Sequence, residues 1–145
     1  MVNSSVQIQK FLFSLTKQIK ADFEQELATA HAGVTGLQYG TLALLQKLSG
    51  AATLNELAQE LLLKPPSLVP TIDSLEHDGY IHREQDSNDR RKIQLMLTDK
   101  GKKLLTDIPM PNGAKSLNLA LEKIGPEKTQ KILELLAELT EQFKK

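Results

Sequence analysis

The chain has 145 residues, of which 40% are hydrophobic and 25% are charged, and its formal net charge is zero. These values predict a hydrophobic core and either a single domain or one compact module with appended helices. No apolar run approaches the roughly 20 residues that span a bilayer, and the first ten residues lack the pattern of a secretory signal. The absence of cysteine excludes disulfides, thiolate zinc sites and thiol switches. We therefore expect a cytoplasmic protein without a cofactor or a membrane partner.

Positive charge is concentrated in one segment of the chain. Residues 82–103 carry 7 basic and 4 acidic side chains, whereas residues 1–81 carry 5 and 8, and residues 104–145 carry 6 of each. A local basic patch is compatible with nucleic-acid binding even when the net charge is zero. The simpler alternative is a solvated, charged turn.

Residues 4–31 are predicted to form one long amphipathic helix. Apolar side chains recur along it at steps of three or four, from Ile8 to Ala30, and Gly33 fits its C-terminal stop. A stripe of this length indicates a dimer contact. The alternative is packing against the chain's own C-terminal helices, and the two are compatible.

Three capping boxes predict where helices begin. In each box a Ser or Thr is followed three residues later by Glu or Gln; the pairs are Ser4 with Gln7, Thr35 with Gln38, and Thr53 with Glu56. Between the second and third predicted helices, Ala51 and Ala52 leave room for a very short strand or a connector.

The next segment predicts a second short helix followed by a hairpin. The helix lies within residues 64–79 and ends at Gly79. Apolar and polar residues alternate from Lys92 to Leu97, which is typical of a strand with one buried face. With a first strand at Tyr80–Glu84 and a loop at Gln85–Arg91, the pattern predicts a winged helix-turn-helix.

The rest of the chain is predicted to be helical with two interruptions. A helix begins after the N-cap Thr98, and Pro109, Pro111 and the Asn112-Gly113 pair then predict a kink. Helical periodicity resumes after residue 113, and Gly125-Pro126 separates the last two helices.

Two motifs of this sequence resemble motifs of the MarR family of bacterial transcriptional regulators. Asp89-Arg90-Arg91, followed by Leu95 to Gly101, fits the pattern D-x-R…L-x-L-T-x-x-G, and Leu75 to Gly79 fits L-E-x-x-G. The resemblance implies a mainly α fold with a small β-wing, in one domain over residues 1–145. Its implied parts are dimerisation helices at 4–33 and 114–145, a winged helix-turn-helix at 35–101, and a connecting helix and kink at 98–113.

The resemblance also implies a homodimer on double-stranded DNA, with a recognition helix in the major groove and a wing in the minor groove. Arg91 matches the arginine that enters the minor groove, where a guanidinium suits the negative potential of narrow A·T stretches. Asp89 would hold Arg91 by a charge-assisted hydrogen bond. Arg83, Arg90 and Lys92 would contact phosphates.

The predicted recognition helix departs from the family pattern. Lys64, Ser67 and Thr71 are its candidate DNA contacts, but Pro70 lies where a basic or polar side chain is expected. Pro70 is harmless if the helix starts late, near Ser67, and otherwise it disturbs the helix. Few side chains here can make bidentate base contacts, so we expect recognition that is weaker than in a typical member or depends more on DNA shape.

The resemblance further implies a small apolar or phenolic effector, with Phe11, Phe23 and Tyr39 as possible lining residues, although each also fits an ordinary core position. No sequence motif of an enzyme or a metal site is present. We therefore predict a homodimeric repressor of the bacterial cytoplasm that binds a pseudo-palindromic operator and is not an enzyme. The alternative is a winged-helix dimer that has lost specific DNA recognition and acts through protein contacts.

Overall fold

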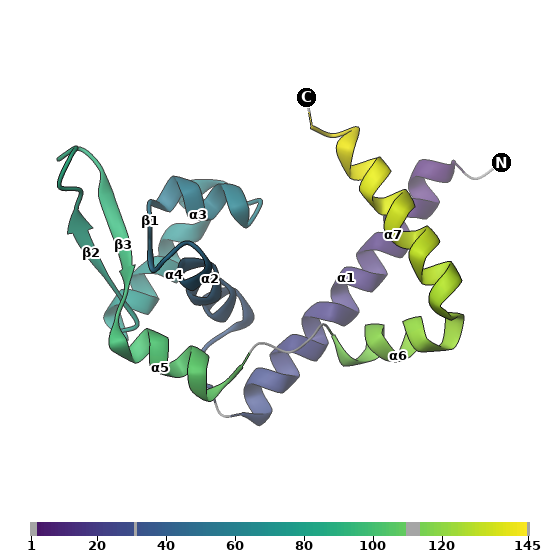
Figure 1. Cartoon of the computed structure of the whole chain (residues 1–145), viewed down its shortest axis with the longest axis horizontal. Helices are drawn as coiled ribbons and strands as arrows, with labels where there is room; N and C mark the ends of the chain where they lie inside the picture. The colour runs from purple at the N-terminus through teal and green to yellow at the C-terminus, as the bar shows by residue number, and fades with distance from the viewer. Residues whose placement is uncertain (1–2, 31, 110–113, 145) are drawn as a thin grey trace. The chain divides into compact units, whose positions relative to one another are not determined.

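The computed structural model describes residues 3–30, 32–109 and 114–144, and it is mainly α-helical with a small sheet (Figure 1). The elements in chain order are α1 (Ser4–Thr29), α2 (Gly36–Lys47), β1 (Ala51–Ala52), α3 (Leu54–Glu60), α4 (Pro65–His77), β2 (Ile81–Gln85), β3 (Ile93–Leu97), α5 (Asp99–Asp107), α6 (Lys115–Ile124) and α7 (Pro126–Glu141). The predicted fold class, mainly α with a small β-wing, is confirmed. None of the helices in the described part of the chain is long and apolar enough to cross a membrane.

The chain divides into two compact units, and α1 contributes to both. One unit contains Met1–Phe23 and Pro111–Lys145, and the other contains Glu24–Met110. The predicted kink at residues 109–113 falls outside the described residues except for Pro109, which lies in no helix.

The unit Glu24–Met110 holds a three-stranded antiparallel sheet in the order β1-β3-β2. In the β2–β3 hairpin Ile81 pairs with Leu97 and Gln85 with Ile93. Both strands begin one residue later than predicted. At Tyr80 the reason is local, because its N–H donates to the Leu75 carbonyl and so closes α4 instead of joining the sheet.

The core of this unit lies between the sheet and the helices α2, α3 and α4. Its most deeply buried apolar side chains, all at most 2% exposed, are Tyr39, Leu42, Leu45, Ala52, Leu57, Ala58, Leu68, Ile72, Leu75, Ile81 and Leu95. Side chains from the helix pair and from the sheet are therefore buried together, and this burial holds the wing against the helix-turn-helix.

Two of the three predicted capping boxes mark helix starts. Thr35 and Gln38 form the complete box of α2, and the Thr53 hydroxyl accepts from the Glu56 N–H at the start of α3. The predicted box at Ser4 is wrong. Asn3 takes the capping position, because its side-chain oxygen accepts from the Ser5 N–H at 2.8 Å.

The helix α4 does not start near Ser67, which was the condition under which Pro70 would be harmless. The helix begins at Pro65, with both Pro65 and Pro66 in its first turn, and Pro70 lies in its interior. Proline suits the first turn because no intrahelical donor is needed there. At position 70 it removes the N–H that would bond to the Pro66 carbonyl. Both Pro66 and Pro70 are exposed, so this missing bond lies on the outer face of α4.

In the other unit, a side chain of α1 caps the start of α6. Asp22 accepts from the Ser116 N–H at 2.9 Å and also from the Ser116 hydroxyl. These bonds lower the pKa of Asp22 below its ordinary value. Because Ala114, the N-cap residue of α6, has no side-chain acceptor, Asp22 supplies the cap from a distant part of the sequence.

The hairpin is joined to α5 by a tight turn that has no room for a side chain at Gly101. The Thr98 hydroxyl donates to the Gly79 carbonyl at 2.6 Å and accepts from the Gly101 N–H at 3.2 Å. A Cβ atom at Gly101 would lie 2.5 Å from the Tyr80 carbonyl oxygen and 2.9 Å from Leu97 Cδ1. The wing therefore depends on glycine at this position.

We predict that Gly101→Ala lowers the free energy of unfolding by about 1–3 kcal/mol, because the new methyl group overlaps a backbone atom. Equilibrium denaturation in urea measures the change. Gly40→Ala is the matched control, since a Cβ there meets nothing within 4 Å and alanine favours the helix by up to about 1 kcal/mol. Equal stabilities for the two variants would contradict the prediction.

Candidate DNA-binding site

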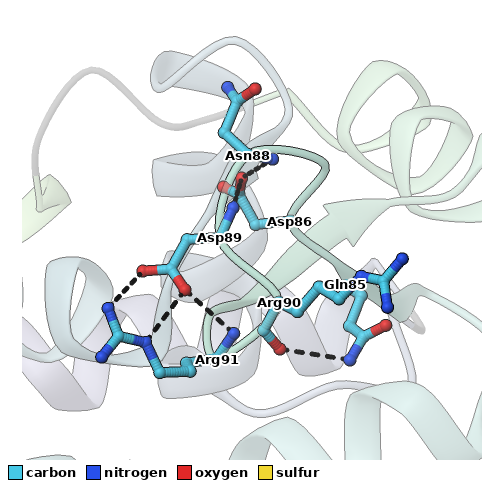
Figure 2. Close-up of polar contacts among 6 residues, drawn as sticks. All are labelled: Gln85, Asp86, Asn88, Asp89, Arg90 and Arg91. Carbon is cyan, nitrogen blue, oxygen red and sulfur yellow. Dashed lines mark hydrogen bonds and ion pairs between the residues drawn. The ribbon is translucent and has the colours of Figure 1, made fainter.

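The tip of the wing is organised by the carboxylate of Asp86 (Figure 2). One oxygen accepts from the backbone N–H groups of Asn88 at 2.8 Å and Asp89 at 3.1 Å, and the other accepts from the Gln94 side chain at 3.0 Å. The Gln94 and backbone bonds lower the pKa of Asp86. Asp86 lies in the loop predicted at Gln85–Arg91, and its side chain accepts from the backbone N–H two residues later, which is an Asx-turn.

The predicted bond between Asp89 and Arg91 is present in the same turn. Figure 2 shows the Asp89 carboxylate against the Arg91 guanidinium. The carboxylate accepts from Arg91 Nε at 3.2 Å and from Nη2 at 3.5 Å. The carboxylate also accepts from the Arg91 backbone N–H at 3.0 Å. The contact with Arg91 lowers the pKa of Asp89. The Arg91 side chain is nevertheless 91% exposed. Asp89 therefore orients a guanidinium that remains accessible to a partner.

Arg90 and Lys92, the two other basic residues of the tip, are both exposed. The side-chain amide of Gln85 donates to the Arg90 carbonyl at 3.1 Å, which fixes the backbone on this side of the turn (Figure 2). The Lys92 N–H donates to the Asp89 carbonyl, and its carbonyl accepts from Asp86 N–H. The backbone of the tip is thus held, while its basic side chains point to solvent.

Arg83 lies in a different environment from the one predicted for a phosphate contact. Its guanidinium binds two carboxylates of α4, Asp73 at 2.6 Å and Glu76. The bond to Asp73 and the charge of Glu76 raise the pKa of Arg83. These two acidic residues therefore connect the recognition helix to the wing.

The outer face of α4 combines few polar groups with several apolar ones. Lys64 is the N-cap residue of the helix, Ser67 is exposed and Thr71 is half-buried. Pro66, Val69 and Pro70 are exposed between them. Val69 was not among the predicted site residues, although its spacing from Pro66 and Pro70 places all three on one helix face.

The three aromatic residues proposed to line an effector cleft lie in different environments. The Tyr39 side chain is buried and its hydroxyl donates to the Ile108 carbonyl, whereas Phe11 is 70% exposed and Phe23 is half-buried. A hollow of about 540 Å³ lies where α1 meets α2. Its described lining residues are Glu24, Leu27, Ala28, Ala32, Gly33, Val34, Thr35 and Gln38.

The unit of Met1–Phe23 and Pro111–Lys145 exposes many large apolar side chains. On α1 they include Ile8, Phe11, Leu12, Leu15 and Ile19, and on α7 they include Ile132, Leu133, Leu135, Leu136 and Leu139. Contiguous apolar surface of this kind marks an interaction site.

These elements define a winged helix-turn-helix, and comparison with known proteins gives its family. The MarR family model matches residues 34–93, from the residues before α2 to the start of β3. The HTH-type transcriptional regulator FarR of Neisseria gonorrhoeae is 32% identical over 108 residues, which cover 74% of this chain and 73% of FarR. The chain belongs to the MarR family of helix-turn-helix transcriptional regulators.

Solved structures have the same fold. Sco3205, a MarR family transcriptional regulator from Streptomyces coelicolor in complex with DNA, matches with a TM-score of 0.81 and 20% identity, over 100% of this chain and 91% of its own. CouR from Rhodococcus jostii RHA1, bound to p-coumaroyl-CoA, matches with a TM-score of 0.65 and 23% identity, over 74% of each chain.

We predict that Arg83→Ala lowers the free energy of unfolding by about 1 kcal/mol. It removes two partly exposed ion pairs, each worth about 0.2–1 kcal/mol, and leaves the Asp73 and Glu76 carboxylates close together without a cation. Denaturation in urea measures the loss. Arg90→Ala is the control, because Arg90 forms no ion pair among the described residues.

A double-mutant cycle isolates this contact from the general effect of losing a charge. Asp73→Asn should cost less in the Arg83→Ala background than in the natural chain, because its partner is already gone. Additive losses would show that the contact contributes nothing to stability.

The wing tip should loosen in acid. The pKa values of Asp86 and Asp89 lie below their ordinary value of 3.8, so the stability they contribute is present above about pH 4 and is lost as the pH falls through their lowered values. NMR titration of the backbone amides of Asn88 and Arg91 should give midpoints below 3.8. In Asp86→Asn the Asn88 amide should lose the titration due to Asp86. A midpoint above 3.8 in the natural chain would contradict this assignment.

Proposed function

We propose that the protein is a ligand-responsive repressor that binds a pseudo-palindromic operator as a homodimer in the bacterial cytoplasm. The observation that carries this proposal is the wing tip, where Asp86 and Asp89 hold the backbone and leave the Arg91 side chain 91% exposed. An ordered turn that presents an exposed guanidinium has already lost much of the entropy that binding would otherwise cost.

Six of the predicted DNA contacts have direct roles in this proposal, whereas Arg83 and Asp89 hold other groups of the site in place. Arg91 enters the minor groove, where its charge meets the negative potential of A·T-rich stretches. Arg90 and Lys92 contact phosphates and add affinity without sequence information. Lys64 contacts the backbone beside the start of α4, and the hydroxyls of Ser67 and Thr71 bond to phosphates or base edges in the major groove.

The proposal of a homodimer rests on the exposed apolar side chains of α1 and α7. The stripe at Ile8, Leu12, Leu15 and Ile19 recurs at helical spacing, and it needs a large apolar partner to be removed from water. A second copy supplies the same surface around a two-fold axis. Two recognition helices related by this axis fit a pseudo-palindromic operator.

Repression and a ligand response complete the proposal. A dimer on promoter DNA excludes polymerase by its bulk, without any further activity. We propose that a small apolar or phenolic molecule shifts the dimer between a form that fits the operator and one that does not. CouR, which shares the fold, binds p-coumaroyl-CoA, and the hollow between α1 and α2 of this chain is one place where a ligand could act.

The outer face of α4 favours a second candidate function. Three exposed positions, Pro66, Val69 and Pro70, cannot donate or accept side-chain hydrogen bonds. A winged-helix dimer that acts through protein contacts and has lost specific DNA recognition would also tolerate such a face.

We predict that Arg91→Ala weakens operator binding by about 5- to 150-fold and lowers the slope of log affinity against log salt by about 1. The operator is first selected from random double-stranded DNA with the full-length protein, and fluorescence anisotropy at several salt concentrations then gives the affinities. Lys123→Ala on α6 is the control for the loss of one positive charge, and it should leave affinity and slope unchanged.

The same experiment separates the two candidate functions. Selection of one sequence that Arg91→Ala no longer binds supports the repressor. If no sequence is enriched, or if Arg91→Ala binds like the natural chain, the repressor proposal fails and the protein-contact function is favoured.

A further inference from the structure

The solvent-facing side of α4 carries an apolar ridge where a DNA-recognition helix needs side chains that distinguish bases. Pro66, Val69 and Pro70 occupy positions i, i+3 and i+4, which are neighbours on a helix surface. Pro66 and Pro70 are exposed, and Val69 is 37% exposed. Asp73 continues the same row at position i+7.

Three polar side chains of α4 near this ridge are already bound within the protein. The Asp73 carboxylate is 2.6 Å from Arg83, and Glu76 binds the same guanidinium. The Ser74 hydroxyl accepts from the Gln38 side chain at 2.9 Å. These groups therefore serve the packing of α4 against α2 and the wing, whereas the ridge, together with Ser67 and Thr71, is left for a partner.

The apolar surface continues from the ridge toward the wing. Val69 and Ile93 of β3 both line a small hollow of about 140 Å³, together with Leu54, Ile72, Arg83 and Leu95. Ile93 is 51% exposed. An apolar group that approaches Val69 therefore meets a surface larger than one side chain.

We propose that α4 recognises the 5-methyl groups of thymines through Pro66, Val69 and Pro70. In the major groove the thymine methyl is the one apolar feature that a base edge presents, and it distinguishes A·T and T·A pairs from each other and from G·C pairs. Val69 is then a specificity-determining residue. This inference rests on the proposed operator binding, and it adds the chemical group of the bases that the recognition helix recognises.

Uracil in place of thymine tests the inference, because it removes only the methyl group and leaves every hydrogen-bonding group of the base. In the selected operator, each thymine is replaced in turn by deoxyuridine, and the affinity of the full-length protein is measured. At one or two positions in each half-site the affinity should fall about fourfold, which corresponds to the roughly 0.8 kcal/mol of one buried methyl-sized group.

Two variants connect the effect to the ridge. In Val69→Ala, the ratio of the affinities for thymine and uracil should fall to one at one of these positions. Thermal unfolding verifies that this variant folds. Arg91→Ala is the matched control, because it should weaken binding to both DNAs and leave their ratio unchanged. The DNA substitution does not alter the protein, so it remains a valid test if Val69→Ala is unstable.

The outcomes distinguish this inference from the proposed function. An operator that requires Arg91 but is insensitive to uracil at every thymine overturns the inference and keeps the repressor. A preference for cytosine that is lost in Asp73→Asn also overturns the inference. The Asp73 carboxylate would then be the group that recognises a base. If no operator is selected at all, both proposals fail.

Discussion

The ion pairs of Arg83 with Asp73 and Glu76 join the wing to the recognition helix. A winged helix-turn-helix must present two elements at a fixed separation, since its recognition helix and its wing meet adjacent grooves. The planar guanidinium binds carboxylates in a defined geometry, and here it joins β2 to α4 across 10 and 7 residues of sequence. Each pair adds little stability at this exposure, so its main consequence is geometric. Buried Leu68, Ile72 and Ile81 hold the same elements from the core side.

Four carboxylates that are bound within the protein explain how a chain of zero net charge exposes a basic wing tip. Asp86 and Asp89 bond to backbone N–H groups of the turn, and Asp73 and Glu76 bond to Arg83. Arg90, Arg91 and Lys92 remain exposed at the wing. Counting charges along the sequence located the basic segment, but it could not show that the acidic residues within and beside it are bound to their own backbone or to Arg83.

The parts of the fold that follow from local sequence were predictable, and those that depend on tertiary contacts were not. Capping residues predicted the starts of α2, α3 and α5, and alternation predicted the hairpin, because both patterns act within a few residues. The Asp89–Arg91 bond was predicted for the same reason. The partners of Arg83 and the Asp22 cap of α6 join residues that are distant in sequence, so no local pattern reveals them. Pro65 and Pro66 did contain a usable signal, since proline favours the first helical turn and placed the start of α4 before Ser67.

A rigid connection between helix and wing also limits how a ligand could control the proposed repressor. If α4 and the wing moved separately, an effector could release DNA by displacing one of them within a single copy. The Arg83 ion pairs and the shared core oppose such a movement, because it would break both ion pairs and expose apolar side chains. A change in the spacing between two otherwise rigid copies needs neither of these losses. Under the proposed function, the ligand response should therefore act on the helices that join the copies, while the wing and α4 keep their geometry in both states.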